Sequence, residues 1–373
     1  MIMDDSKIRV LHVTFNMNIG GTEQVIRQII ENSDVEKFEH EILCIDGETG
    51  SLGLALKEKG VHVESTRRQA GTDFRLIRFI RQLIKSRGIN VLHCHQYTPY
   101  FYGVLAAAGK HVKVIFTEHG RFFPDRHHFK RRFINPLLVM MTDHITAISK
   151  STADAVAKYE YVRRDRIDVI YNGICDLQGK APNREALLNE LGLAEQYRYI
   201  GTISRLEPIK NQAMMIKAFH LSKQEVPELK LVLIGDGAIK PELVALASSL
   251  GVEQDVIFTG FIDNPQRFLS LFEIFLLSSF SEGTSMTLLE AMSLSRPCVV
   301  TSVGGSPEIV TNHETGILVP SDDVMLFSAA IAALLSDRDL RASYGKAGRE
   351  RFLKKFTAER MIECYHALYE GKE

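Results

Sequence analysis

The sequence predicts an α/β protein with two doubly wound domains, and three observations lead to that prediction. Short apolar runs rich in Val and Ile alternate with helix-length amphipathic segments along almost the whole chain. Strands separated in this way are typical of parallel sheets with crossover helices on both faces. A polar stretch with Gly and Pro at residues 172–186 interrupts the alternation, which then resumes. A chain of 373 residues is also long for a single core.

The first domain is expected to span residues 1–174. Each expected strand is a short apolar run, and most are followed by apolar residues at three- and four-residue spacing, as in a helix that packs on a sheet. The expected strands are residues 8–15, 40–46, 61–66, 91–95, 112–119, 144–149 and 167–173, and the expected helices are 22–32, 51–60, 74–86, the segment after Thr98 and a segment from Ser151.

The second domain is expected to span residues 175–355. The same alternation of strand and helix patterns predicts a second parallel sheet there. Its expected strands are residues 197–204, 230–237, 256–261, 274–279, 296–305 and 316–320. Because ligands of such sheets bind beyond the carboxyl ends of the strands, two facing domains would share one cleft.

The composition excludes several classes of function. A formal net charge of −1 gives no overall basic field, so nucleic acid is not an expected partner. The five cysteines form no paired framework and no amino-terminal signal pattern is present, which indicates a reducing, cytoplasmic setting. The most apolar stretch, at residues 134–141, is far shorter than the roughly 20 residues that span a bilayer.

Two polar clusters follow expected strands of the first domain. Gly20 and Gly21 lie between the first strand and a helix start at Thr22, where glycine permits close backbone approach. The pair does not form a GxGxxG fingerprint, so a dinucleotide cofactor is not expected. His119 ends another expected strand, at residues 112–119, where a single histidine could also be structural.

The second domain places cations at the end of its first strand. Arg205 and Lys210 follow residues 197–204, and Asp236 stands between two glycines after the next strand. Isolated surface cations are common. Two cations at one strand end suit a diphosphate, because arginine offers a bidentate fork and lysine a point charge.

Two glutamates bracket a helix start after the strand at residues 274–279. Glu282 is expected on the strand-to-helix turn and Glu290 about two turns into the helix. Taken alone, the pattern could be an acid favoured by the helix dipole and a solvated glutamate.

These motifs occur together in the order seen in retaining glycosyltransferases, and the chain resembles glycosyltransferase family 4 from about Ile8 to its last helix. That family has the GT-B architecture of two Rossmann-like domains and an E-x7-E motif, which the separation of Glu282 and Glu290 fits. The shared features are Arg205, Lys210, Glu282, Gly283, Glu290 and the glycine pair before Glu308.

The resemblance implies roles for individual residues. Glu282 would hold hydroxyls of the donor sugar, Glu290 the ribose diol, and Arg205 with Lys210 the departing diphosphate. His119 would lie near the sugar and its reactive carbon. The catalytic residues are therefore expected to be His119, Glu282, Arg205 and Lys210, and the substrate-binding residues Gly20, Gly21, Gly283, Thr284, Ser285, Met286, Glu290 and Glu308.

The resemblance also implies a function. The chain is expected to be a retaining, metal-independent hexosyltransferase that moves a sugar from a nucleotide-sugar, with UDP favoured, to a saccharide or lipid-linked acceptor in polysaccharide or glycolipid synthesis. No cofactor is expected, and residues 356–373 should form a helix that returns to the first domain. Two other classes stay open: a GT-B sugar phosphorylase or nucleotide-sugar epimerase, and a non-catalytic nucleotide-sugar-binding subunit.

Two motifs resemble metal-binding sequences, but neither predicts a metal site. His93, Cys94 and His95 lie on a strand, whose neighbouring residues face opposite sides, and no further Cys or His cluster has ligand spacing. Asp337 and Asp339 spell D-x-D in a late helical region far from the strand ends, where a solvated helix surface explains them.

Two basic segments of the first domain are candidates for an anionic membrane surface. The helix at residues 74–86 carries one apolar and one basic stripe, and a basic loop with four phenylalanines follows at residues 120–133. Plain solvated surface is the alternative. Peripheral association with the inner face of the membrane is thus an expectation for this cytoplasmic protein.

Overall fold

The structure is a computed structural model that describes residues 7–120, 129–179 and 182–372. The chain divides into two compact units, which are described separately. The first unit comprises Met1–Gly173 with Ala358–Glu373, and the second comprises Ile174–Thr357.

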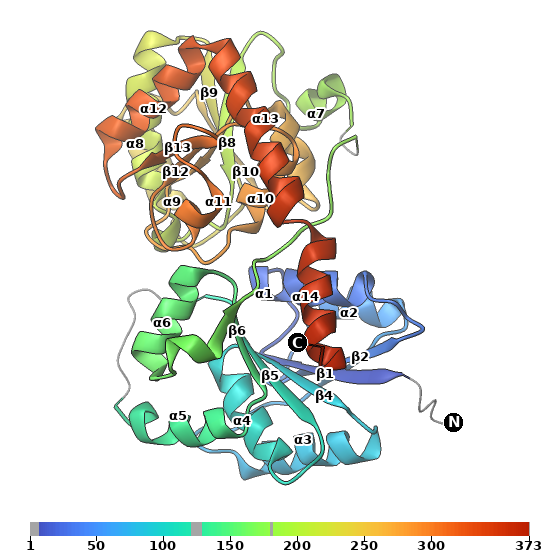
Figure 1. Cartoon of the computed structure of the whole chain (residues 1–373). Coiled ribbons are helices and arrows are strands. Elements are labelled where there is room, and N and C mark those ends of the chain that lie inside the picture. The colour runs from blue at the N-terminus through green and yellow to red at the C-terminus, as the bar shows by residue number, and fades with distance from the viewer. Residues whose placement is uncertain (1–6, 121–128, 180–181, 373) are drawn as a thin grey trace. The chain divides into compact units, whose positions relative to one another are not determined.

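The first unit contains a seven-stranded parallel sheet in the order β3-β2-β1-β4-β5-β6-β7 (Figure 1). Its apolar strands pack against helices on both faces, as their sequences predict. The strands are β1 (Ile8–Thr14), β2 (Phe38–Cys44), β3 (His62–Ser65), β4 (Val91–His95), β5 (Lys113–Glu118), β6 (His144–Ala147) and β7 (Ile167–Val169), and the helices are α1 (Gly21–Glu31), α2 (Ser51–Glu58), α3 (Phe74–Ser86), α4 (Tyr97–Ala107), α5 (Arg131–Met140), α6 (Lys150–Glu160) and α14 (Ala358–Glu370).

Helix α14, the last of the chain, packs on the first unit beside α1 and β1. Tyr365 and Tyr369 are buried, and Tyr369 bonds through its hydroxyl to Nδ1 of His93 at 2.8 Å. The ring of His366 stacks on Phe38 at 4.1 Å between centroids. These aromatic contacts fix α14 over one face of the sheet.

The second unit contains a six-stranded parallel sheet in the order β10-β9-β8-β11-β12-β13. Its core consists of strand residues packed against α8 and α12, which lie side by side. The strands are β8 (Arg198–Ile203), β9 (Leu229–Ile234), β10 (Val256–Gly260), β11 (Ile274–Leu277), β12 (Cys298–Thr301) and β13 (Gly316–Val319), and the helices are α7 (Arg184–Glu190), α8 (Gln212–Glu225), α9 (Lys240–Ser249), α10 (Met286–Ser293), α11 (Ser306–Ile309), α12 (Val324–Ser336) and α13 (Arg338–Lys355).

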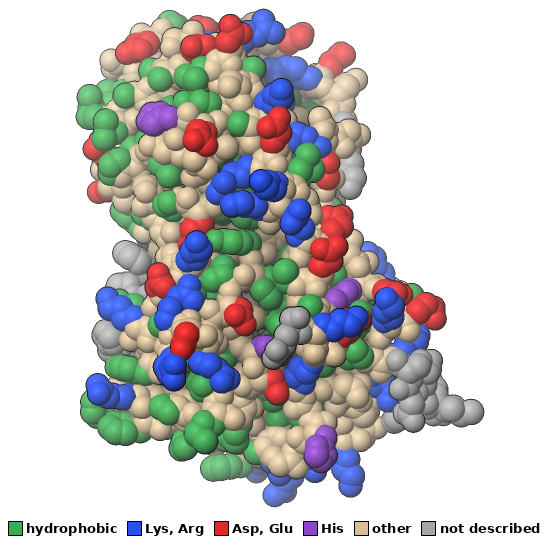
Figure 2. All heavy atoms as spheres, in the orientation of Figure 1, with side chains coloured by type: hydrophobic (Ala, Val, Ile, Leu, Met, Phe, Trp, Pro, Cys, Tyr) green, Lys and Arg blue, Asp and Glu red, His purple; other side chains and the backbone are tan. Residues whose placement is uncertain are grey.

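The two parallel sheets confirm the fold class predicted from the sequence. Helix α3 also packs as its apolar stripe predicts, with Leu76, Ile80, Leu83 and Ile84 buried. Its basic stripe is only partly available to a ligand, because Arg81 donates to three backbone carbonyls at the end of α4. Basic and acidic side chains are interspersed on the face that Figure 2 shows.

The basic loop expected at residues 120–133 ends earlier than predicted, because α5 begins at Arg131. Residues 121–128 of that loop lie outside the described residues. Within the described part of the chain, no helix is long and apolar enough to span a bilayer.

Candidate active site

The strand order of the second unit reverses between β8 and β11, which are hydrogen-bonded neighbours. In doubly wound sheets, ligands bind beyond the carboxyl ends of the strands at such a reversal. The loops that follow these two strands are bonded to each other. The N–H of Phe280 donates to the carbonyl of Ile209 at 2.8 Å, and the hydroxyl of Ser278 donates to the carbonyl of Lys210 at 2.9 Å.

An ion pair between Lys210 and Glu282 lies at this reversal. Nζ of Lys210 is 2.7 Å from Oε1 of Glu282, and the two side chains are 22% and 8% exposed. The hydroxyl of Ser279 donates to the same Oε1 at 2.6 Å. Because an ammonium group has three donors, Lys210 can bind Glu282 and a phosphate oxygen together. The pair therefore presents a positioned cation beside a positioned carboxylate.

Glycines let neighbouring backbone segments approach this pair. Gly304, after β12, has φ +53°, and a Cβ there would lie 1.9 Å from the carbonyl oxygen of Glu282. The next N–H, of Gly305, donates to that same oxygen at 3.0 Å. A side chain at position 304 would thus displace Glu282. The glycine pair noted in the sequence serves to hold Glu282.

Helix α10 starts next to this ion pair. Ser285 is its N-cap and accepts a hydrogen bond from the N–H of Leu288 at 3.4 Å. Gly283 and Thr284 lie between Glu282 and this cap, and Met286 is the first helical residue. The first N–H groups of a helix have no partner within the helix, so α10 offers donors to an anion.

Glu290 lies nearer the helix start than predicted. The sequence suggested about two turns into the helix, but α10 begins at Met286, which makes Glu290 its fifth residue. At 3.6 residues per turn it is little more than one turn in. The half-buried Glu290 therefore lies close to the loop that carries Glu282.

Arg205 and Glu308 lie outside the Lys210–Glu282 pair. Arg205 is 69% exposed and its guanidinium pairs with Glu207 at 2.7 Å. Glu308 lies in the short helix α11, and its carbonyl accepts a hydrogen bond from Arg351 at 2.8 Å. Arg205 is thus available to a ligand at the cost of a weak surface ion pair.

Sequence reasoning missed two polar residues of this site. Ser279 orients the carboxylate of Glu282, and its place three residues before that glutamate was the available signal. Gln212 is buried at the start of α8, and its Nε2 donates to the carbonyl of Arg205 at 2.8 Å. Nothing in its sequence context marked it, because a glutamine after an expected loop is commonplace.

In the first unit, Gly20 and Gly21 form the start of α1. Gly20 is the N-cap in an extended conformation, and a Cβ there would meet only the carboxylate end of Glu23, at 2.3 Å. Beside Gly21 no described atom lies within 4 Å of a Cβ position. The space over this helix start is open among the described residues.

His119 follows β5 and is held by another histidine. Its Nε2 lies 2.8 Å from Nδ1 of His95. Burial lowers the pKa of His119 to about 3. The ring is therefore neutral at physiological pH, and it can donate or accept a hydrogen bond without bringing a positive charge.

Three buried histidines come together beneath His119. Ring nitrogens of His12, His93 and His95 lie within 4.8 Å of one another. The sequence shows no further Cys or His cluster with ligand spacing, whereas the fold brings His12 of β1 beside the pair on β4. The parallel register places His12 directly opposite His93, which sequence spacing does not reveal. Both nitrogens of each ring already lie within hydrogen-bond distance of a partner. A metal would have to displace these bonds.

The D-x-D motif has a structural role at its first position. Asp337 is the N-cap of α13 and accepts a hydrogen bond from the N–H of Leu340 at 2.8 Å. Asp339 lies in the first turn of the same helix, where a carboxylate is favoured by the helix dipole.

Comparisons with known proteins match both units. A family model described as Glycosyltransferase Family 4 matches residues 19–176, and one described as Glycosyl transferases group 1 matches residues 183–351. EpsF of Bacillus subtilis strain 168, which is named as a glycosyltransferase, is 30% identical over 383 residues, covering 96% of this chain and 93% of EpsF. The chain belongs to glycosyltransferase family 4.

Other proteins with named activities or solved structures are similar to this chain. UDP-Gal:α-D-GlcNAc-diphosphoundecaprenol α-1,3-galactosyltransferase of Escherichia coli is 24% identical, over 98% of this chain and 97% of that enzyme. A glycosyltransferase from Rickettsia africae has a TM-score of 0.87 at 17% identity, and covers 98% of both chains. Anabaena HepE in complex with UDP has a TM-score of 0.83 at 19% identity, covering 98% of this chain and all of HepE. These structures confirm the GT-B fold.

Proposed function

We infer that this family-4 transferase moves a hexose from a UDP-sugar to a lipid-linked or saccharide acceptor, with retention of the anomeric configuration. The observation that carries the proposal is the Lys210–Glu282 pair, braced by Ser279 at the strand-order reversal beside the start of α10. One cation, one carboxylate and a helix start suit the diphosphate and the sugar of one donor molecule.

Each group has a role in breaking the bond between sugar and phosphate. Negative charge develops on the departing diphosphate, where Arg205, Lys210 and the first N–H groups of α10 stabilise it. One such positioned donor contributes about 3 kcal/mol to catalysis. Glu282 binds hydroxyls of the donor sugar, and Glu290 binds the ribose diol.

The acceptor attacks from the same face that the diphosphate leaves. The bond from the anomeric carbon to the phosphate oxygen breaks, the bond to the acceptor oxygen forms, and the acceptor proton passes to the released phosphate. This route requires no protein nucleophile and no metal. It gives retention, because the new bond takes the place of the old one.

The relatives support the choice of donor and acceptor. HepE binds UDP, and the Escherichia coli enzyme is named for a UDP-galactose donor and a diphosphoundecaprenol acceptor. UDP is therefore the proposed nucleotide of this transferase, and a polyprenyl diphosphate-linked saccharide is the proposed acceptor class.

The exposed surface of helix α5 supports the proposal of a lipid-linked acceptor. Phe133, Leu137 and Met140 are 64%, 62% and 83% exposed, and their spacing places them on one helix face. Lys130 and Arg132 are exposed beside them. Hydrophobic side chains gather over α5 at the lower left of Figure 2. An apolar face next to cations is the pattern of a helix that lies on an anionic membrane.

Vesicle binding tests this surface. Leu137→Ser should weaken co-sedimentation with vesicles that contain anionic lipid, while Leu54→Ser on α2, which also replaces an exposed leucine, should have no effect. Equal binding by both variants would contradict the role of α5.

A donor panel tests the reaction itself. Purified protein is incubated with UDP- and GDP-sugars and an undecaprenyl diphosphate-linked acceptor, with a chelator present, and nucleoside diphosphate and product are measured. One UDP-sugar should react, Glu282→Ala should abolish the reaction, and NMR of the product should show the anomeric configuration of the donor. Glu190→Ala, which removes an ion pair with Arg267 away from the loops, is the matched control.

The same panel separates the other functions. Dependence on free phosphate would indicate a phosphorylase, and an epimerised donor without acceptor an epimerase. Donor binding without turnover on any acceptor would indicate a non-catalytic subunit. An inverted product would contradict retention.

A further inference from the structure

Four histidine rings form a continuous chain along one face of the sheet of the first unit. Nε2 of His119 lies 2.8 Å from Nδ1 of His95, and Nε2 of His95 lies 3.0 Å from Nδ1 of His12. Nε2 of His12 lies 3.0 Å from Nδ1 of His40. Each contact joins one Nε2 to one Nδ1, so the four rings are connected head to tail.

The chain crosses the sheet diagonally because of the strand register. His40 on β2 is opposite Val10 on β1, and His12 lies two residues further along β1. His12 is opposite His93 on β4, and His95 lies two residues further; His95 is opposite Thr117 on β5, and His119 again lies two residues further. Residues two apart on a strand share a face, so all four rings lie on the same side of the sheet.

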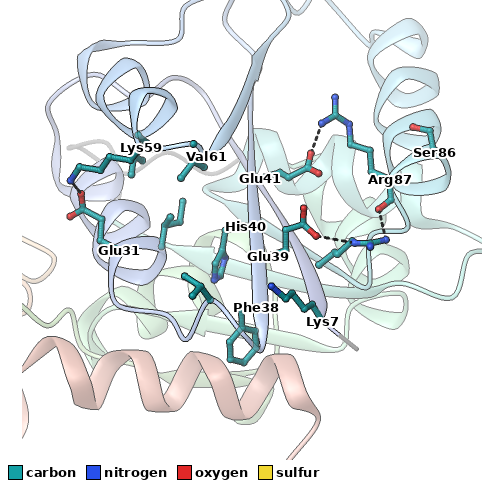
Figure 3. A pocket seen from close by; sticks show the side chains of 15 residues that line it. Lys7, Glu31, Phe38, Glu39, His40, Glu41, Lys59, Val61, Ser86 and Arg87 are labelled. Atoms are coloured by element: carbon teal, nitrogen blue, oxygen red, sulfur yellow. Dashed lines mark hydrogen bonds and ion pairs between the residues drawn. The ribbon is translucent and has the colours of Figure 1, made fainter. Parts of the chain in front are cut away.

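At one end of the chain, His40 lines a pocket of the first unit. His40 lines a cavity of about 940 Å³ together with Phe38, Glu41, Lys59 and Arg87 (Figure 3). Its carboxylates are held in ion pairs with cations of the same pocket. The residues around His40 come from the first half of β2, whereas His119 follows the carboxyl end of β5.

Both ends of the chain are unpartnered among the described residues. Nδ1 of His119 and Nε2 of His40 are buried ring nitrogens without a hydrogen-bond partner in that part of the protein. A buried polar atom left in this way is costly unless a ligand or water completes it. The contacts within the chain are thus complete, and a nitrogen at each end lacks a partner.

Only two placements of the ring protons let every contact of the chain be a hydrogen bond. A neutral imidazole carries one N–H and one bare nitrogen. Four neutral rings have four N–H groups for three bonds, so the spare N–H lies at one of the two ends. Either all four rings carry the proton on Nε2, with the spare N–H on His40, or all four carry it on Nδ1, with the spare N–H on His119.

The surroundings keep the rings neutral. His93, Tyr365 and Tyr369 pack against the chain without contributing a charge, and His93 bonds to Tyr369 and Thr117 instead of to the four rings. Burial lowers the pKa of His12, His93 and His95 well below the usual value, and that of His40 to about 3.

We propose that His95, His12 and His40 are positioning residues that set the tautomer of His119, and that the four rings change tautomer together. In one arrangement Nδ1 of His119 accepts a hydrogen bond from a hydroxyl of the bound substrate, and in the other it donates one. The state of His119 is thereby coupled to the pocket at His40. The substrate side of this inference rests on the proposed function, and the coupling rests on the chain itself.

A proton can also pass along the chain without charge remaining in it. A proton that binds Nδ1 of His119 is matched by transfer of each Nε2 proton to the next ring and by release of the Nε2 proton of His40 to water in the pocket. Every ring then carries its proton on Nδ1, which is the other permitted arrangement.

Nitrogen-15 NMR of the full chain labelled in histidine tests the proposal without any substrate. Long-range proton–nitrogen spectra distinguish Nε2–H, Nδ1–H and charged rings, and single variants assign the signals. At neutral pH the rings of His119, His95, His12 and His40 should all be neutral and share one tautomer. Two different tautomers among the four, or one charged ring, would overturn the proposal.

Two variants at the ends of the chain should drive the middle rings in opposite directions. In His40→Phe the Nε2 of His12 loses its partner. The three remaining rings still have one spare N–H, which is favoured at His119, where water or a ligand can complete it, over a place against the phenyl ring. His12 and His95 should therefore carry the proton on Nδ1. In His119→Phe the Nδ1 of His95 loses its partner, and the same two rings should carry it on Nε2. The same tautomer in both variants would contradict the coupling.

Further readouts distinguish coupled rings from a general change in the pocket and from a metal site. Lys59→Met changes the same pocket outside the chain and should leave all four rings as in the unaltered protein. If either phenylalanine variant does not fold, the shared tautomer of the unaltered protein remains the test. Addition of zinc should leave the signals of the four rings unchanged. Stoichiometric shifts of the His12, His93 and His95 signals would indicate a metal site and contradict the proposal. None of these outcomes depends on sugar transfer.

Discussion

The two units treat buried polar groups in opposite ways. In the second unit the loops after β8 and β11 hold opposite charges together, with Lys210 and Glu282 at 2.7 Å. In the first unit the sheet holds a chain of neutral imidazoles. Fixed cations bind a charged diphosphate, whereas neutral hydrogen-bond donors and acceptors bind sugar hydroxyls. Under the proposed function, charge in the second unit binds the nucleotide, and hydrogen-bond polarity in the first unit acts on the sugar and acceptor.

The largest expected effect is the loss of Lys210 from the second unit. Lys210→Ala removes a donor to the leaving diphosphate, and kcat should fall by about 100- to 1,000-fold. It also leaves the Glu282 carboxylate without its cation, which should lower the melting temperature. Steady-state kinetics and thermal unfolding measure both. Lys223→Ala, which leaves Asp255 still paired with Lys230, is the control. An equal fall in kcat in that variant would contradict a specific role of Lys210 in catalysis.

Breaking the histidine chain at its middle should cost stability in the first unit. His12→Phe leaves a ring nitrogen of His95 and one of His40 unpartnered, and each such buried atom costs about 1–3 kcal/mol. Chemical denaturation measures the change in the free energy of unfolding. Lys59→Met should change that free energy by less than about 1 kcal/mol, since its ion pair with Glu31 is on the surface. An unchanged stability in His12→Phe would mean that the rings are not bonded as described.

The pH dependence of the free energy of unfolding should show whether the buried histidine chain is neutral. The pKa of His40 is lowered to about 3 by burial, so in mild acid the unfolded chain binds a proton that the folded protein does not. Stability from this ring is fully present above about pH 6.5 and is lost as the pH falls toward 3, at about 1.4 kcal/mol per pH unit.

His40→Phe should remove that contribution. Between about pH 6.5 and 5, the free energy of unfolding should fall less steeply with decreasing pH in the variant than in the unaltered protein. The difference in slope should be the contribution of one histidine. Identical slopes for His40→Phe and the unaltered protein would contradict the burial of a neutral His40.

The smallest expected effect is the loss of the cap of α10. Ser285→Ala should lower the free energy of unfolding by about 1 kcal/mol, because the N–H of Leu288 loses its acceptor. The donor KM should rise more than kcat falls, since the helix start is proposed to bind the diphosphate. Ser249→Ala, which removes a serine hydroxyl bonded to a carbonyl at the end of α9, is the control. An equal effect of the two substitutions would argue against a specific capping role.

The fold was predictable from local patterns, whereas contacts across strands were not. Alternating apolar runs predicted both sheets, and the apolar run at residues 274–279 predicted the place of Glu282 after β11. Helix α10 starts later than expected because Ser285 caps it, which also moves Glu290 nearer the helix start. The histidine chain depends on the register of four strands, and no sequence pattern of a single strand contains that register.

Calorimetric titration with UDP tests the central distinction between charge and hydrogen-bond polarity most directly. The unaltered protein should bind UDP, Lys210→Ala and Arg205→Ala should each bind at least about tenfold more weakly, and His40→Phe should bind as the unaltered protein does. UDP affinity that survives both cation variants, or that falls as far in His40→Phe, would contradict the assignment of the nucleotide to the charged loops of the second unit.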